Sequence, residues 1–252
     1  MIMLHKGSRD LTHGGLEQIK TPEPTRTHLP IPHHVLLAET EKAITDADYE
    51  ISDHRLLVSK EGQKFLGSMT VTSPLWDYVS DYVFKVAVMS SHDRTLPIKF
   101  FTGTEVFVCT NGCWSAELML SRKHTHGAWG DIHNNLGTLV LQLNELRTKT
   151  VESFEALKEF DFDSRKEVHD FIIESSKCKI LPWQHQPHVL EHWNNPEHPE
   201  FTDRNGYVLF NAYTSFWRKG NPMTLAHKTQ ELRKLFDTFK GVEKKVDILE
   251  VL

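Results

Sequence analysis

The sequence has few cysteines and no long apolar run, and each absence excludes a class of protein. Three cysteines among 252 residues cannot form a disulfide framework, which indicates a reducing, cytoplasmic location. No apolar stretch reaches the roughly 18 residues that a membrane span requires. Residues 1–10 lack the apolar core of a signal peptide. We therefore expect a cytoplasmic protein with no membrane partner.

The familiar catalytic motifs are also missing. The chain has no Walker loop, no nucleophile-elbow serine, no dinucleotide-binding glycine fingerprint and no paired catalytic carboxylates. These absences leave enzymatic activity uncertain and favour a non-enzymatic protein without a cofactor. The net charge of −5 argues against a protein that coats DNA with its whole surface.

The spacing of apolar residues predicts an α+β fold. Short β-branched and aromatic runs alternate with turn signals at a spacing that favours antiparallel hairpins. The predicted strands cover residues 49–59, 64–72, 82–90, 96–102 and 105–109. Helical periodicity covers residues 36–47 and returns after residue 113. We expect a mainly antiparallel sheet in the first half, packed by helices from the second half.

Three signals place helices in the second half. One apolar stripe runs from Leu136 and can continue through Leu157. Ser164 and Glu167 have the spacing of a capping box, which predicts a helix start. Asn221 and the proline after it predict another helix start.

The ends of the predicted domain differ in composition from its centre. Four prolines between Pro22 and Pro32 predict an extended N-terminal arm over residues 1–35, which docks through its apolar residues. Residues 36–252 are predicted to form a single domain. Within it, prolines and histidines gather at about residues 181–203, which predicts a long irregular loop.

Histidine is the residue in excess, with 16 copies in 252 residues. Cys109 and Cys113, together with His124 and His126, could form a zinc site of two thiolates and two imidazoles. The favoured alternative is that Cys109 ends a buried strand as a small apolar residue. We therefore expect no cofactor, and a metal-dependent hydrolase built on these four residues remains a further alternative.

Cations beside aromatic residues point to nucleic acid. The cations that precede the helix after residue 126 could hold a phosphate. The segment 214–245 has more Lys and Arg than acids, and aromatic residues lie just before it. Rings that stack on bases and cations that follow phosphates are what single strands require. A solvated helix face is the alternative. The candidate nucleic-acid-binding residues are Arg122, Lys123, His124, Tyr213, Trp217, Arg218, Lys219, Arg233 and Lys234.

Four segments resemble the family known as domain of unknown function 932. The first is the central segment 91–111, whose runs 91–95 (SHDRT) and 100–111 (FFTGTEVFVCTN) are similar to the core motif of the family. Residues 122–125 (RKHT) are similar to its RHT element with one residue inserted, and residues 210–214 (FNAYT) to its NA-T element. The segment 27–34 (THLPIPHH) resembles the start of some members. Asn111, Asn211 and Thr214 are the motif-loop candidates.

This resemblance implies a protein of phages, plasmids and laterally transferred bacterial regions, in a family with no agreed activity. Such a context favours nucleic-acid handling in replication or recombination, or interference with host defence. By analogy with single-strand annealing proteins of phages, we expect a homo-oligomer that binds nucleic acid, single-stranded in preference. The alternative is an inhibitor that binds a host defence protein through the histidine-rich loop and the arm.

Overall fold

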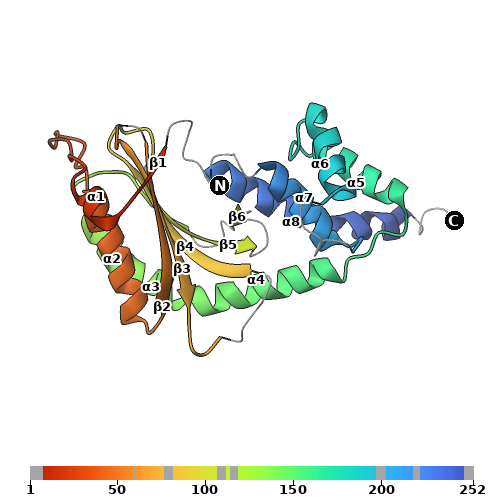
Figure 1. The fold of residues 1–252 in the computed structure, drawn as a ribbon, viewed down its shortest axis with the longest axis horizontal. Helices are drawn as coiled ribbons and strands as arrows, with labels where there is room; N and C mark the ends of the chain where they lie inside the picture. The colour runs from red at the N-terminus through yellow and green to blue at the C-terminus, as the bar shows by residue number, and fades with distance from the viewer. Residues whose placement is uncertain are drawn as a thin grey trace.

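One antiparallel sheet and two groups of helices make up the fold (Figure 1). The computed structural model describes residues 8–59, 61–76, 82–106, 112–113, 119–196, 203–217 and 222–246. The α+β class predicted from the sequence is confirmed, with the sheet built mainly from the first half of the chain.

The sheet has seven strands, and every pairing is antiparallel. The spatial order is β1-β2-β3-β4-β5-β6, and β7 also pairs with β5. The long β2 to β5 form the centre through consecutive hairpins. The strands are β1 (Arg9–Leu11), β2 (Glu50–Val58), β3 (Lys64–Thr72), β4 (Tyr82–Ser91), β5 (Ile98–Val106), β6 (Gly112–Cys113) and β7 (Met119–Arg122).

The helices fall into two groups, joined by one long helix (Figure 1). Two helices cover one face of the sheet, α2 (His33–Asp46) and α3 (Ala128–Leu141), and α1 (His13–Glu17) contacts α2. The joining helix is α4 (Leu143–Lys158). The second group consists of α5 (Arg165–Lys177), the 3-10 turn η1 (Trp183–His185), α6 (Gln186–Asn194), α7 (Gly206–Trp217) and α8 (Pro222–Val246).

The covered face of the sheet carries the first hydrophobic core. Alternate strand residues point to this face, as the period of two requires, and Phe65, Val86 and Phe100 pack with Leu36 and Ile132. The backbone and the helix approach closely at β3, because a Cβ on Gly67 would lie 2.8 Å from Phe65 and 3.3 Å from Leu37. A side chain at position 67 would therefore push α2 away from the sheet.

The second group of helices has a core of its own. Its fully buried aromatic side chains include Phe154, Phe171, Phe210 and Tyr213. The helix α4 belongs to both cores, because Leu143 and Leu146 pack in the sheet core while Phe154 and Leu157 pack among the helices.

Three of the expected boundaries are wrong. The predicted break between strands 96–102 and 105–109 lies inside β5, where Gly103 pairs with Lys85. The apolar stripe from Leu136 to Leu157 is buried as predicted, but the helix that carries it is interrupted at Gln142, which separates α3 from α4. The expected irregular loop at 181–203 is helical over η1 and α6, because Val189 and Trp193 are buried in the helical core.

The expected N-terminal arm is ordered over its described residues but is not extended throughout. It contributes β1 to the sheet edge and then forms α1. Helix α2 also starts within it, at His33. The helices on the sheet therefore come from both halves of the chain. In the parts that the structure describes, no helix combines the length and the apolar character needed to cross a membrane.

Candidate anion-binding site

Three segments that are distant in sequence meet at one end of the sheet. Arg122 at the end of β7 pairs with Ile98 at the start of β5, so the residues after β7 lie beside the β4–β5 turn. The backbone NH of Leu29 donates to the carbonyl of His124 over 3.0 Å, which fixes the N-terminal segment to the same place. The sheet topology therefore brings three of the four motif segments together.

These segments line a pocket of about 390 Å³. Its charged side chains are those of Arg94 and Lys123, and no acidic residue is part of the lining. The remaining lining residues offer hydroxyl groups, imidazoles and two apolar contacts. They are Thr27, His28, Thr95, Leu96, Pro97, His124 and Thr125.

The β4–β5 turn that carries Arg94 is fixed by side-chain hydrogen bonds. The Asp93 carboxylate accepts from the backbone NH of Thr95 over 3.0 Å, and the Ser91 hydroxyl accepts from the NH of Leu96 over 2.8 Å. Arg94 has a φ of +64°, in the left-handed region that residues with a Cβ rarely adopt. The turn therefore holds the arginine in a costly conformation beside the pocket, a feature that is frequent at functional sites.

Four histidines are buried around the pocket. The rings of His33 and His92 stack with centroids 3.8 Å apart, and those of His28 and His124 are 5.2 Å apart. Backbone carbonyls hold the stacked pair, since His33 Nε2 bonds to the Gly62 oxygen and His92 Nε2 to the Ile31 oxygen. His124 Nε2 is hydrogen-bonded to the Ser90 hydroxyl over 3.2 Å.

Burial keeps these imidazoles neutral. Desolvation, with the charge of His92 as the next cause, lowers the pKa of His33 to about 3. Desolvation, then His28 and His92, lowers the pKa of His124 to about 4. Desolvation is also the main reason that the pKa values of His28 and His92 are lowered. At neutral pH the positive charge of the pocket therefore comes from Arg94 and Lys123.

Both pocket-lining imidazoles have a buried nitrogen without a close hydrogen-bond partner. His28 Nε2 and His124 Nδ1 form no hydrogen bond among the described residues, although the backbone of His92 lies near His28 and that of Leu29 near His124. A buried polar nitrogen without a partner costs about 1–3 kcal/mol, so such groups commonly serve a ligand or a bound water. The Thr95 hydroxyl donates to the Asp93 carboxylate, so the two cations and the hydroxyls of Thr27 and Thr125 are the further groups with which the pocket can hold an anion that has several oxygen acceptors.

Two of the candidate nucleic-acid residues, Lys123 and His124, lie in this pocket. The neighbouring Arg122 is absent from the lining, and its Nε donates to the Asp131 carboxylate over 3.2 Å. His126, proposed as a zinc ligand, is exposed. The sequence therefore located one of the three segments of the site and missed the contributions of His28 and Arg94.

The aromatic half of the predicted nucleic-acid surface must be corrected. Tyr213 is fully buried, and its hydroxyl donates to the Ser175 hydroxyl over 2.7 Å. Trp217 is 4% exposed and lies under the Lys228 ammonium. Neither ring can stack on a base, because both belong to the helical core. The aromatic side chains predicted to stack on bases therefore belong to the buried apolar face of α7.

Of the two candidate cations of α8, Arg233 is not the expected exposed phosphate ligand, whereas Lys234 is exposed. The Arg233 guanidinium lies over the rings of Phe154 and Phe210, at 5.0 and 5.7 Å from their centroids. Arg233 is thus placed against the aromatic core. Lys234 is exposed and pairs with Glu231 over 2.7 Å.

Two motif-loop candidates lie inside a helix. Asn211 is buried in α7 and donates its amide to the Tyr207 carbonyl over 2.8 Å, and the Thr214 hydroxyl donates to the Asn211 carbonyl. Their bonds stabilise α7 itself. Asn111, Cys109, Arg218 and Lys219 fall outside the described residues, and only the backbone of Cys113, in β6, is described.

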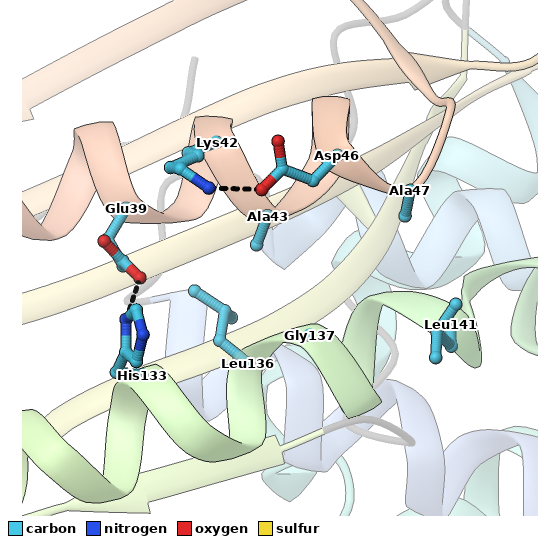
Figure 2. A pocket seen from close by; sticks show the side chains of 9 residues that line it. All are labelled: Glu39, Lys42, Ala43, Asp46, Ala47, His133, Leu136, Gly137 and Leu141. Carbon is cyan, nitrogen blue, oxygen red and sulfur yellow. Dashed lines mark hydrogen bonds and ion pairs between the residues drawn. The ribbon is translucent and has the colours of Figure 1, made fainter.

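A second depression lies between α2 and α3 (Figure 2). The Glu39 carboxylate and His133 Nδ1 pair across it over 2.7 Å, and Lys42 pairs with Asp46 along α2. The Glu39 carboxylate thus has a hydrogen-bond partner within the groove, and the Lys42 ammonium has a partner of opposite charge. It therefore offers a ligand less uncompensated charge than the pocket of Arg94 and Lys123.

Comparison of the chain with known proteins finds no relative. No family model, no curated protein and no solved structure matches the chain. The resemblance to the family of domain of unknown function 932 therefore stays a prediction from short motifs.

Proposed function

We propose that the protein binds nucleic acid, single-stranded in preference, through a phosphate group held in the pocket of Arg94 and Lys123. The observation that carries the proposal is the convergence of three distant segments on a pocket with two cations and no acidic lining residue. An anionic ligand compensates this charge, and phosphate oxygens suit arginine, lysine and hydroxyl donors.

The neutral histidines contribute donors to the same ligand. A neutral imidazole has one NH and one acceptor nitrogen. When the Ser90 hydroxyl donates to His124 Nε2, the ring proton resides on Nδ1, the nitrogen without a partner. His124 then offers an NH to a phosphate oxygen without carrying a charge of its own.

The overall charge of the chain limits how it binds a polyanion. The net charge of −5 repels nucleic acid over most of the surface, so attraction is confined to the local cations. The burial of Tyr213 and Trp217 removes the base-stacking platform expected on α7. We therefore propose recognition through phosphate rather than through bases, in a cytoplasmic protein of a mobile genetic element.

The test is binding of a labelled single-stranded oligonucleotide at low salt, followed by fluorescence anisotropy. Lys123→Gln should weaken binding, and the slope of log K against log salt should fall by about 0.7 for each phosphate that the variant no longer neutralises. Arg94→Asn should act likewise, since asparagine tolerates the left-handed backbone. Lys166→Gln is the matched control, because Lys166 is an exposed cation on α5.

Wild-type protein with no affinity for single strands at low salt would remove this proposal. The inhibitor of a host defence protein would then be the better hypothesis. Equal affinity in wild type and Lys123→Gln would instead move the binding surface away from the pocket.

We also propose that the protein acts as a homo-oligomer, as the analogy with annealing proteins suggests. Sedimentation velocity with and without oligonucleotide tests this, and a monomer under both conditions would contradict it.

A further inference from the structure

Three potential metal ligands meet beside the sheet, where α1 contacts α2 and α2 contacts β2. His13 is the first residue of α1, Glu41 lies in α2 and His54 in β2. One ligand atom of each residue lies within 4.8 Å of the other two. None of the three lines the pocket of Arg94 and Lys123, so this cluster is independent of the proposed function.

The geometry of the cluster is not explained by hydrogen bonds alone. The Nε2 atoms of His13 and His54 both lie 2.9 Å from the same atom, Oε1 of Glu41. His13 forms a hydrogen bond with that oxygen. His54 Nε2 is buried and has no hydrogen-bond partner, although it is equally close. Two imidazoles thus converge on one carboxylate oxygen, and only one of them is satisfied by it.

We propose that His13, Glu41 and His54 bind a divalent transition-metal ion, of which Zn²⁺ fits best. Zinc takes imidazole nitrogens and carboxylate oxygens at about 2.0–2.2 Å, which places neighbouring ligands of a tetrahedron roughly 3.3 Å apart. The two 2.9 Å spacings to Glu41 need to widen by roughly 0.4 Å to admit the ion, and the nitrogens of the two imidazoles, which lie within 4.8 Å of each other, need to reach the same spacing. The unpartnered His54 nitrogen then gains a bond.

The exposure of the ligands sets the rest of the coordination. The side chains of His13, Glu41 and His54 are 52%, 25% and 30% exposed. One side of the ion therefore faces solvent, and a water completes a site of three protein ligands.

The three ligands come from three different elements, so the ion ties the N-terminal segment to the body of the fold. His13 and Glu41 are 28 residues apart, and α1 follows β1, the edge strand of the sheet. An ion that binds only when these elements are assembled stabilises the folded state. We infer a structural role for this site.

The test is titration of the metal-free full chain with Zn²⁺ and with Co²⁺ as a spectroscopic probe. We expect one tight equivalent, visible ligand-field bands for Co²⁺, and a melting temperature that rises by about 5 °C or more when free Zn²⁺ is 100-fold above Kd. Glu41→Gln and His54→Gln should each weaken binding at least about tenfold. Glutamine keeps the size of either side chain, and circular dichroism without metal checks that both variants fold.

The matched control is the other histidine–carboxylate pair of the same region. Glu39 and His133 form a pair across α2 and α3 without a second imidazole (Figure 2). Glu39→Gln and His133→Gln should leave metal affinity and the Co²⁺ spectrum unchanged.

Three results would overturn the proposal. One is wild-type protein that binds neither Zn²⁺ nor Co²⁺ in the micromolar range. Another is unchanged affinity in both Glu41→Gln and His54→Gln, which would place the ion elsewhere. A third is intense thiolate-to-Co²⁺ charge transfer in the near ultraviolet, because that would assign the ion to cysteine ligands.

Discussion

Single residues of this protein are most informative where a titratable side chain is buried. Burial desolvates His33 and His124, and their pKa values of about 3 and about 4 lie far below the ordinary value of histidine. The sequence showed that histidine is abundant. It could not show which histidines are buried, because burial depends on the docking of the N-terminal segment against the sheet.

Acid should destabilise the protein in a defined pH window. The unfolded chain takes up protons near the ordinary histidine pKa of about 6.5, whereas folded His33 and His124 do so only at about 3 and about 4. The free energy of unfolding is thus unaffected by these two rings above pH 6.5, and it decreases as the pH falls toward 4. Urea unfolding should lose about 1.4 kcal/mol per pH unit for each histidine involved.

Two variants assign this loss to the buried rings. The slope of the free energy of unfolding against pH should be smaller in His33→Gln by about one proton equivalent. The substitution also lowers the stability at pH 7, but this does not affect the slope. His169→Gln, at an exposed position of α5, should leave the slope unchanged. A free energy of unfolding that is constant from pH 6.5 to 5 would contradict the buried neutral cluster.

Tyr213 tests whether the aromatic residues of α7 bind a ligand or only pack. Its hydroxyl donates to Ser175 within the helical core. Tyr213→Phe removes this bond and should reduce the free energy of unfolding by about 1 kcal/mol. The affinity for a single-stranded oligonucleotide should stay at the wild-type value. A loss of affinity at unchanged stability would restore Tyr213 as a binding residue.

At the scale of elements, the sequence predicted long periodic segments better than their ends. Strand β3 begins and ends at the predicted residues, because its apolar residues alternate and turn signals flank it. The break at Gln142 carried no such signal, since the residue has neither the fixed φ of proline nor the freedom of glycine. The buried face continues across the break, since Leu136 and Leu146 both pack in the sheet core and Phe154 packs among the helices further along α4.

The start of α5 is an element that the sequence described correctly, and it can be tested directly. The Ser164 hydroxyl accepts from the backbone NH of Glu167, and the Glu167 carboxylate accepts from the NH of Asp163. Ser164→Ala should therefore cost about 1 kcal/mol of stability in chemical denaturation. Ser164→Asp keeps an acceptor at the cap and should cost much less. Equal losses in both variants would show that the cap contributes nothing.

At the scale of the whole molecule, the candidate pocket depends on strand order. His28, Arg94 and Lys123 come from three separate loops, before α2, between β4 and β5, and after β7. They meet because β4 and β7 are both neighbours of β5, and a sequence pattern does not encode such long-range neighbours. The sequence motifs do not indicate that these segments lie together, and the sheet topology brings them to one pocket.

The division into two hydrophobic cores predicts two units of stability. Phe171 is fully buried in the helical core and Phe65 in the sheet core, and among the described residues α4 contributes to both cores. Phe171→Ala should cost about 3–5 kcal/mol. Native-state hydrogen exchange should then show reduced protection in α5 to α8, with little change in β3 and β4. Phe65→Ala should reverse this pattern.

The pocket of Arg94 and Lys123 lies on the sheet unit, so Phe171→Ala should keep oligonucleotide affinity wherever the sheet stays folded. If either substitution instead lowers the protection of all amides by one common factor, then α4 couples the cores into a single cooperative unit.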